Sequence, residues 1–450
     1  MSSERYLLSY YGDDFTGSTD VMEALTLGGV PTVLFLAPPT EAQLAAFPEA
    51  RAIGIAGTSR AMTPEQMDAH LPEMFTSLKA LNAQFCHYKV CSTFDSSPTL
   101  GNIGRAVELA LETFPQPLVP LIVGAPILKR YVLFGNVFAT ADGTTYRLDR
   151  HPTMSKHPAT PMLESDLSIH LAAQTELTVS SVDVLALAQG AAESLERAKT
   201  SGAKLVLFDT LTDIHLETLG EVLVRLQEEG VRFLAGSSGT EYALVAYLHK
   251  TGKIQPLTTR PTVPKAEKII VISGSAAPTT AAQITEAERR GFTPIRINAP
   301  RLINPKYQNE EHSRLKTLAC EALKKGQSPL LYSARGPDDS ALGETRAALK
   351  TLGYAPSDAG ALLGSEQGKL LRDLLLSTGI RRACVAGGDT CGYAAKQLGI
   401  YALELLKPIA PGSPLCRAHS EREELDGLEL SLKAGQVGQN DYFITVRDGF

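Results

Sequence analysis

The stretch Tyr6–Asp20, YLLSYYGDDFTGSTD, predicts the fold of the N-terminal half of the chain. Its apolar run, Tyr6–Tyr11, stops at Gly12, and a helical pattern begins near Thr19. This succession is typical of a short buried strand, a sharp turn and the start of a helix. Such corners, at the carboxyl ends of parallel strands, are where α/β proteins bind their ligands.

Two adjacent carboxylates, Asp13 and Asp14, occupy this turn. Like charges this close are unfavourable unless a cation, a donor hydroxyl or a helix N-terminus offsets them. One alternative is that one aspartate caps the helix while the other is merely solvated. The small or hydroxylated neighbours Thr16, Gly17 and Ser18 allow a polar ligand to approach, so the turn is a candidate ligand site.

Length and composition limit the class of protein. With 450 residues, 44% of them hydrophobic, the chain can form two domains or one large one. Its net charge of −6, with no basic block, argues against nucleic-acid binding. The N-terminus lacks a signal-peptide pattern and no apolar stretch approaches the ~20 residues that cross a membrane, so we expect a cytoplasmic protein without a membrane partner. The six cysteines form no C-x-x-C pair, which favours reduced thiols.

Strand-like and helical patterns alternate through the first half. Predicted strands span Pro31–Pro38, Ala52–Gly57 (followed by Thr58, Ser59 and Arg60), Phe85–Val90, Leu118–Pro126, Lys204–Asp209 and Val231–Gly236. Predicted helices span Pro64–Leu81, Ile103–Leu111, Ser165–Ala173 and Val182–Lys199. Alternating apolar residues and the Asp142-Gly143 pair predict a β-hairpin excursion within Tyr131–Asp149.

The alternation restarts after Gln255–Pro264, a stretch with three prolines that we interpret as a linker. Predicted strands then span Lys268–Ser273, Thr293–Asn298, Pro329–Ser333 and Ala383–Ala386, and Leu428–Val446 is predicted to be rich in strand. Predicted helices span Thr279–Arg290, Glu311–Lys325, Ser365–Thr378 and Thr390–Leu398. We therefore expect an α/β protein with two domains, residues 1–255 and 265–450, each a mostly parallel sheet flanked by helices.

Two strand ends of the second half carry small polar residues. Ser273–Ser275 and Gly387–Thr390 leave backbone N–H groups free near helix starts, which suits phosphate binding. Each alone is compatible with a plain tight turn. Together with Tyr332–Asp339 and Lys433–Gly438 they favour a nucleotide site. The chain has no Walker A motif, no protein-kinase signature and no G-x-G-x-x-G fingerprint.

Several of these stretches together resemble the four-carbon acid sugar kinase family. The motifs, in the family's order, are DDFTGSTD at Asp13, the loop Ser92–Gly104, HPATPM at His157, GSSG at Gly236, SGS at Ser273, GGDT at Gly387 and KAGQVG at Lys433. The resemblance spans both halves. It implies an N-terminal domain that binds a sugar acid and a C-terminal domain that binds a nucleotide. It further implies transfer of the γ-phosphate of ATP to a hydroxyl of a tetronate or 3-oxotetronate.

The resemblance also implies roles for individual residues. Asp13 and Asp14 would face the sugar acid, with Asp14, or else Asp13, accepting the proton of the attacking hydroxyl. The ATP site would be lined by Ser275, Gly387, Gly388, Asp389, Thr390 and Gly435. Mg²⁺ would bridge the phosphates with few protein ligands, whose identity stays open.

One loop departs from the family pattern. Members usually carry a motif resembling K-x-D-S-T-L-R-G-N-x-G, whose arginine suits a substrate carboxylate, whereas this chain reads KVCSTFDSSPTLGNIG at Lys89–Gly104. The hydroxyls of Ser92, Thr93, Ser96 and Ser97 and the carboxylate of Asp95 are therefore candidate substrate ligands, unless the loop is exposed and only caps the following helix. The cation that binds the carboxylate must come from elsewhere, and the candidates are Lys89, Arg105, Lys129 and Arg130, unless these are surface charges.

The altered loop resembles a branch of the family that acts on branched or longer acids such as 3-oxo-isoapionate. From a different class, the alternative is a non-catalytic two-domain sensor of a sugar acid or nucleotide. Which sugar acid and which hydroxyl react, and whether the chain forms a homo-oligomer, stay open at this point.

Overall fold

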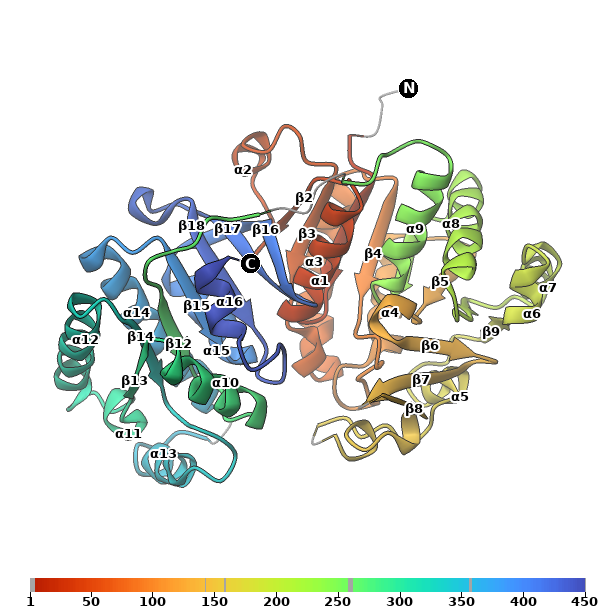
Figure 1. Cartoon of the computed structure of the whole chain (residues 1–450). Helices are drawn as coiled ribbons and strands as arrows, with labels where there is room; N and C mark the ends of the chain where they lie inside the picture. Colours follow the sequence, from red (N-terminus) through yellow and green to blue (C-terminus); the bar gives the residue numbers. More distant parts are fainter. Residues whose placement is uncertain (1–4, 142, 158, 258–261, 356–357, 450) are drawn as a thin grey trace. The chain divides into compact units, whose positions relative to one another are not determined.

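The computed structural model describes residues 5–141, 143–157, 159–257, 262–355 and 358–449. The chain divides into two compact units, residues 1–258 and 259–450, each with its own sheet and core (Figure 1). Part of the predicted linker Gln255–Pro264 lies outside the described residues, as do Asp142 of the predicted hairpin and Pro158 of the HPATPM motif. None of the described helices is long and apolar enough to cross a membrane.

The N-terminal unit is built on a parallel sheet with the strand order β2-β3-β1-β4-β11-β5-β10-β9. Its strands are β1 (Leu8–Gly12), β2 (Thr32–Phe35), β3 (Ala52–Ala56), β4 (Phe85–Lys89), β5 (Val119–Ile122), β9 (Val179–Val182), β10 (Leu205–Phe208) and β11 (Phe233–Gly236). In register, Gly12 pairs with Ala56 and with Lys89, and Lys89 pairs with Gly236. The residues that follow β1, β3, β4 and β11 therefore meet at one edge of the sheet.

Helices cover both faces of this sheet. They are α1 (Phe15–Leu27), α2 (Glu41–Ala45), α3 (Pro64–Ala80), α4 (Ile103–Thr113), α5 (Leu167–Ala172), α6 (Val184–Ala188), α7 (Ala192–Thr200), α8 (Asp213–Glu228) and α9 (Gly239–Lys250). Side chains alternate between the faces of a strand. Tyr11 and Tyr88 accordingly pack into the core with α3 and α4, whereas Tyr10 and His87 contact α1 and α9 on the other face.

A small antiparallel sheet forms the excursion that the sequence predicts. It has three strands, β6 (Arg130–Leu133), β7 (Asn136–Ala141) and β8 (Thr144–Arg147), one more than a hairpin needs (Figure 1). The buried carboxylate of Asp209, directly after β10, accepts hydrogen bonds from the backbone N–H groups of Phe134, Gly135 and Val184. This one side chain joins the turn of the excursion to the main sheet and to the start of α6.

The C-terminal unit has the strand order β13-β14-β12-β15-β18-β17-β16. Its strands are β12 (Ile270–Ser273), β13 (Phe292–Arg296), β14 (Ser328–Tyr332), β15 (Arg382–Ala386), β16 (Ile400–Ala410), β17 (Ser413–Ser420) and β18 (Leu428–Lys433). Its helices are α10 (Pro278–Arg289), α11 (Ala299–Leu302), α12 (Gln308–Lys324), α13 (Ser340–Thr351), α14 (Ala359–Thr378), α15 (Gly388–Gln397) and α16 (Tyr442–Asp448). The pairs β16–β17 and β17–β18 are antiparallel and the others are parallel, so the predicted α/β class is confirmed.

Two sequence predictions are wrong in detail, and one element was missed. The predicted helix Val182–Lys199 is interrupted because Gly190 and Ala191 both have positive φ, which separates α6 from α7. The long antiparallel pair β16–β17 was not predicted. The stretch Leu428–Val446 is strand only as far as Lys433, and its end forms α16.

Candidate functional site

The corner after β1 is shaped by close contacts that need small residues. A Cβ atom on Gly12 would lie 2.0 Å from Oγ of Ser18, so only glycine allows the chain to turn here. Asp14 is the N-cap of α1, and its Oδ1 accepts a hydrogen bond of 2.6 Å from the Gly17 backbone N–H. The sequence alternative that one aspartate caps the helix is therefore correct for Asp14. Asp13 is not solvated, because its side chain is only 4% exposed.

Arg60, which follows β3, bridges the two aspartates. Its Nε and one terminal nitrogen donate to the two oxygens of Asp13, at 3.0 and 2.7 Å, and its other terminal nitrogen donates to Asp14 at 2.7 Å. The Arg60 backbone N–H also donates to the Asp13 carbonyl at 3.0 Å. A bidentate pair of this kind fixes geometry as well as charge. The guanidinium thus offsets the repulsion between the adjacent carboxylates.

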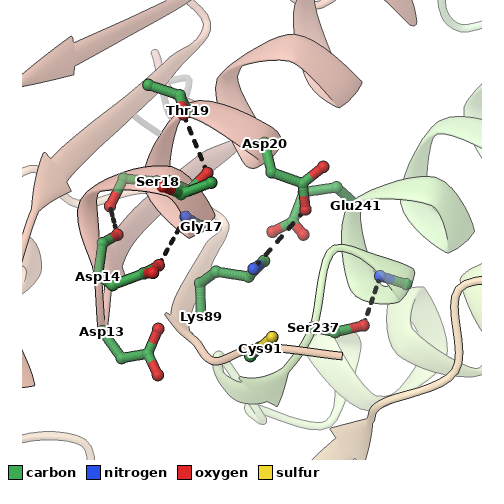
Figure 2. Close-up of polar contacts among 12 residues, drawn as sticks. Asp13, Asp14, Gly17, Ser18, Thr19, Asp20, Lys89, Cys91, Ser237 and Glu241 are labelled. Carbon is green, nitrogen blue, oxygen red and sulfur yellow. Dashed lines mark hydrogen bonds and ion pairs between the residues drawn. The ribbon is translucent and has the colours of Figure 1, made fainter. Parts of the chain in front are cut away.

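Lys89, the last residue of β4, brings a second cation to the corner (Figure 2). Its Nζ lies 3.7 Å from Oδ2 of Asp20, and its side chain is 3% exposed. A Cβ atom on Gly17 would lie 3.1 Å from this Nζ and 2.6 Å from Oδ1 of Asp14. Within the described residues the ammonium donates no hydrogen bond, although buried polar groups normally do. Its three N–H groups remain able to bind a ligand.

We call Asp13, Asp14, Arg60 and Lys89 the acidic corner. Burial raises the pKa of Asp13, and the charge of Arg60 opposes this rise. For Lys89, in contrast, burial acts to lower the pKa, but the charges of Asp20 and Asp13 outweigh this effect, and the pKa is raised. Two carboxylates and two cations balance in formal charge within the corner, but Asp20 lies 3.7 Å from Lys89 and Asp95 lies 4.0 Å from Arg60, so carboxylates outnumber cations around it.

In the altered loop after β4, a series of polar contacts leads from Cys91 through Thr93 and Asp95 to Arg60. Thr93 Oγ1 donates to Asp95 at 2.9 Å, and Asp95 lies 4.0 Å from Arg60. Sγ of Cys91 lies 2.9 Å from Thr93 Oγ1, and burial raises the pKa of this thiol to about 11. Between them Phe94 is buried with φ of 55°, a strained value for a bulky residue.

The remaining predicted substrate residues lie in different surroundings. Ser92 is half-buried in the loop. Arg105, on α4, donates to Asp68 at 2.6 Å and to Glu108 at 2.9 Å, and these are partly exposed ion pairs. Arg130 donates to backbone carbonyls beside it, and Lys129 ends a short turn with φ of 56°. Of the four candidate cations, only Lys89 is joined to the aspartates of the corner.

In the C-terminal unit, the glycine-rich turns line one cavity of about 310 Å³. Five of the six predicted nucleotide residues border it: Ser275, Gly387, Gly388, Thr390 and Gly435. Asp389 lies beside them in the first turn of α15. Leu342, Leu349 and Leu363 also line the cavity, together with the polar side chains of Thr345 and Arg346. Such a cavity offers backbone N–H groups for phosphates and apolar contact for a base.

Lys433 supports the glycine loop from beneath. Its fully buried Nζ donates to Thr280 Oγ1 at 3.2 Å and to the carbonyls of Ala434 and Gly435 at 2.9 and 3.4 Å. Burial lowers the pKa of Lys433 to about 8. A cation therefore lies directly behind Gly435, which borders the cavity.

Comparisons with known proteins agree with this division of the chain. Residues 8–244 match the family described as a sugar-binding N-terminal domain, and residues 270–443 match a nucleotide-binding C-terminal domain. The 3-oxo-isoapionate kinase of Paraburkholderia graminis is 45% identical over 98% of this chain and 94% of its own. The chain belongs to the four-carbon acid sugar kinase family.

A second relative and a solved structure are less similar to the chain. A 3-oxo-tetronate kinase of Pseudomonas savastanoi pv. phaseolicola is 32% identical over 98% of this chain and 97% of its own. A solved structure described as the putative tRNA synthase from Salmonella typhimurium LT2 has a TM-score of 0.75 and 26% identity, with 97% of each chain covered. The family resemblance predicted from the sequence is confirmed.

Sequence reasoning did not identify Arg60, Asp20, Glu241 or His87 as part of the site. Arg60 could have been found, because it follows the end of the predicted strand Ala52–Gly57 just as Asp13 follows the end of β1, and these two strands are neighbours in the sheet. Asp20 lies on the second turn of α1 and Glu241 in the first turn of α9, and no pattern in the sequence joins them.

Proposed function

We propose that the protein is an ATP-dependent kinase that phosphorylates a hydroxyl of a small sugar acid. The observation that carries this proposal is the 45% identity, over 98% of the chain, with a 3-oxo-isoapionate kinase. In this proposal residues 1–255 bind the sugar acid and residues 265–450 bind the nucleotide. The reaction would take place in the cytoplasm, where ATP is available.

For the substrate we propose a branched 3-oxo acid such as 3-oxo-isoapionate. The identity with the kinase named for that acid exceeds the 32% found for a 3-oxo-tetronate kinase. The loop from Cys91 to Asp95 supports the same choice. It presents hydroxyls and a carboxylate, which accept hydrogen bonds from substrate hydroxyls, whereas an arginine cannot.

We assign the general base to Asp14. Its side chain is 28% exposed, against 4% for Asp13, so a substrate hydroxyl can reach it. Its oxygens accept from Gly17 and Arg60, yet a carboxylate has about four lone-pair sites and retains room for a further donor. Asp13 would hold the guanidinium of Arg60 in place, and it is the second candidate for the base.

We propose that Lys89 binds the carboxylate of the substrate. The ammonium donates no hydrogen bond within the described residues and lies beside the carboxylates of the corner. Its side chain is as buried as that of Asp13, so in this proposal the substrate reaches it past the more exposed Asp14 and displaces the first turn of α1. Arg60 uses three of its five N–H donors on Asp13 and Asp14, so it can add further hydrogen bonds to the same ligand.

We propose that ATP binds in the cavity bordered by Ser275, Gly387 and Gly435. Mg²⁺ suits this cavity, because the described residues hold no cluster of three carboxylate, His or Cys ligands and the metal would rely on phosphate and water oxygens. The buried Oε1 of Gln367, which has no partner among the described residues and lies near Gly274, could accept a hydrogen bond from a metal-bound water. When bound, the metal would neutralise charge on the phosphates.

An ADP-release assay over a panel of sugar acids tests this function. We expect ADP release that depends on 3-oxo-isoapionate, with weaker use of 3-oxo-tetronates and of D-threonate or D-erythronate. Binding of a sugar acid or ATP by calorimetry, without ADP release for any acid of the panel, would instead support the non-catalytic sensor.

A further inference from the structure

A second set of buried ionisable groups lies on the same face of the sheet as Lys89. His87 and Lys89 are two residues apart on β4, so their side chains point to the same face. On that face, Nδ1 of His87 lies 2.5 Å from Oε1 of Glu241, and both side chains are fully buried. Figure 2 shows Glu241 from α9 and Asp20 from α1 converging near Lys89.

The two carboxylates act on one another. Burial raises the pKa of Asp20, the charge of Lys89 opposes this, and the charge of Glu241 raises it further. Burial likewise raises the pKa of the neighbouring Tyr242, and the charges of Asp20 and Glu241 add to that rise. Asp20 and Glu241 therefore contribute negative charge to the same small region of the interior.

Fold stability is a poor explanation for this cluster. Buried ion pairs lose more hydration than they recover unless every polar atom is paired. Here Nε2 of His87 and Oε2 of Glu241 have no hydrogen-bond partner in the described part of the chain. Apolar side chains of similar volume would fill this space at lower cost. A functional role at Lys89, the nearest group of the acidic corner, accounts for the cluster better.

We propose that Asp20 holds the ammonium of Lys89 directed at the acidic corner and that Glu241, anchored by His87, repels Asp20 toward Lys89, so that these three residues are positioning residues for the sugar acid. The proposal rests on the function proposed above, in which Lys89 binds the substrate carboxylate. Burial alone would drive the proton off a lysine. The charge of Asp20, together with that of Asp13, compensates for that effect, and in this proposal Asp20 does so without touching the substrate.

The pH dependence of kcat/KM for the sugar acid tests the proposal. In Asp20→Asn we expect the alkaline limb to move down by at least about one pH unit, since an opposite charge nearby typically shifts a pKa by about 1–3 units. Glu241→Gln removes a charge that acts on Asp20 and not directly on Lys89, so its alkaline limb should not move down. At neutral pH, kcat/KM should fall about 10- to 100-fold through misplacement of Lys89, with KM for ATP unchanged. The other charged or titratable groups near Lys89 stay in place in both variants: Asp13, Asp14, Arg60 and Cys91.

Two further variants separate positioning from simple destabilisation. Arginine stays protonated without help, so Lys89→Arg and the double variant Lys89→Arg, Asp20→Asn should share one pH profile. Glu229→Gln, which removes the surface partner of Lys199 in the same unit, is the matched control and should behave as the wild type. Should Glu241→Gln fail to fold, Asp20→Asn, whose side chain is 14% exposed, carries the test.

The two proposals can fail separately. If the wild type is active and its pH profile does not change in Asp20→Asn, the positioning role of Asp20 is overturned while the kinase function stands. If the wild type phosphorylates no sugar acid, NMR titration of the Lys89 ε-methylene still measures its pKa. If the pKa of Lys89 does not fall in Asp20→Asn, the positioning role of Asp20 is overturned, and this result does not depend on turnover.

Discussion

The α-carbon of Gly17 faces the ammonium of Lys89 so closely that a Cβ atom there would lie 3.1 Å from Nζ. The same atom would lie 2.6 Å from Oδ1 of Asp14. The first turn of α1 is thus packed against two groups of the acidic corner. No side chain can be added at this position without moving one of them.

Gly17→Ala should therefore impair the sugar-acid site and leave the fold intact. Alanine favours a helix over glycine by about 1 kcal/mol, which offsets the cost of displacing the capping side chain of Asp14, about 1 kcal/mol as well. We expect kcat/KM for the sugar acid to fall by at least about 10-fold, because a small misplacement of reacting groups is costly. Gly343→Ala, on α13 with open space around its Cβ position, is the control. Equal activity of the two variants would show that Gly17 does not shape the site.

Asp14→Asn tests the general base. Asparagine is as good an N-cap as aspartate, so the start of α1 should be preserved. Loss of the base should reduce kcat by about 10²–10⁴-fold, with ATP affinity nearly unchanged. If Asp14→Asn were active and Asp13→Asn inactive, the role would pass to Asp13. Normal turnover by both variants would place catalysis elsewhere.

Gly388→Val tests the nucleotide cavity. No atom lies within 4 Å of a Cβ at this position, so the substitution should leave the fold intact while the added side chain reduces the space for phosphate. We expect ATP affinity, measured by calorimetry, to fall at least about 10-fold, because backbone N–H groups must approach phosphate closely. Gly343→Val adds the same side chain outside the cavity and is the control. Unchanged ATP affinity in folded Gly388→Val would rule out this cavity as the ATP site.

In the loop after β4, we expect different effects from substitutions of Ser96 and of Thr93. Ser96 is buried, lies 2.9 Å from Nε2 of His170 and accepts from Gln174 at 2.9 Å, while Ser97 closes a turn at Leu100. Ser96→Ala should thus lower the melting temperature, because it leaves buried partners unpaired, without changing substrate preference. The ratio of kcat/KM for branched and unbranched acids should change instead in Thr93→Val. A changed ratio in Ser96→Ala alone would contradict this assignment.

Because the pKa of Lys433 is lowered, the free energy of unfolding should depend on pH. Its pKa is lowered from 10.5 to about 8, so between these values the unfolded chain binds more protons than the folded one. The free energy of unfolding contributed by this residue should therefore rise as the pH increases from about 8 to 10.5. Urea titrations of the wild type and of Lys433→Met at several pH values measure the difference. A difference that does not rise with pH in this interval would show that Lys433 keeps its ordinary pKa.

The sequence predicts the local corners well, because each depends on residues close together in the chain. The strand, turn and helix of residues 6–27 follow from one apolar run, one glycine and one capping aspartate. The strand end that carries Arg60 was predictable, but the contacts between distant residues were not. Arg60 lies 47 positions from Asp13, and Glu241 lies 154 positions from His87. Only the register of β1, β3, β4 and β11 brings these side chains to one edge of the sheet.

The hydrogen bonds of Asp209 determine how the three-stranded excursion can move. Separating the excursion from the main sheet would expose a buried carboxylate and leave the backbone N–H groups of Phe134 and Gly135 without their acceptor. The excursion should therefore not open as a separate lid, but should unfold together with β10. Amide exchange at Phe134 and Gly135 would then be as slow as in the central strands, and a protease would find no early cleavage point there.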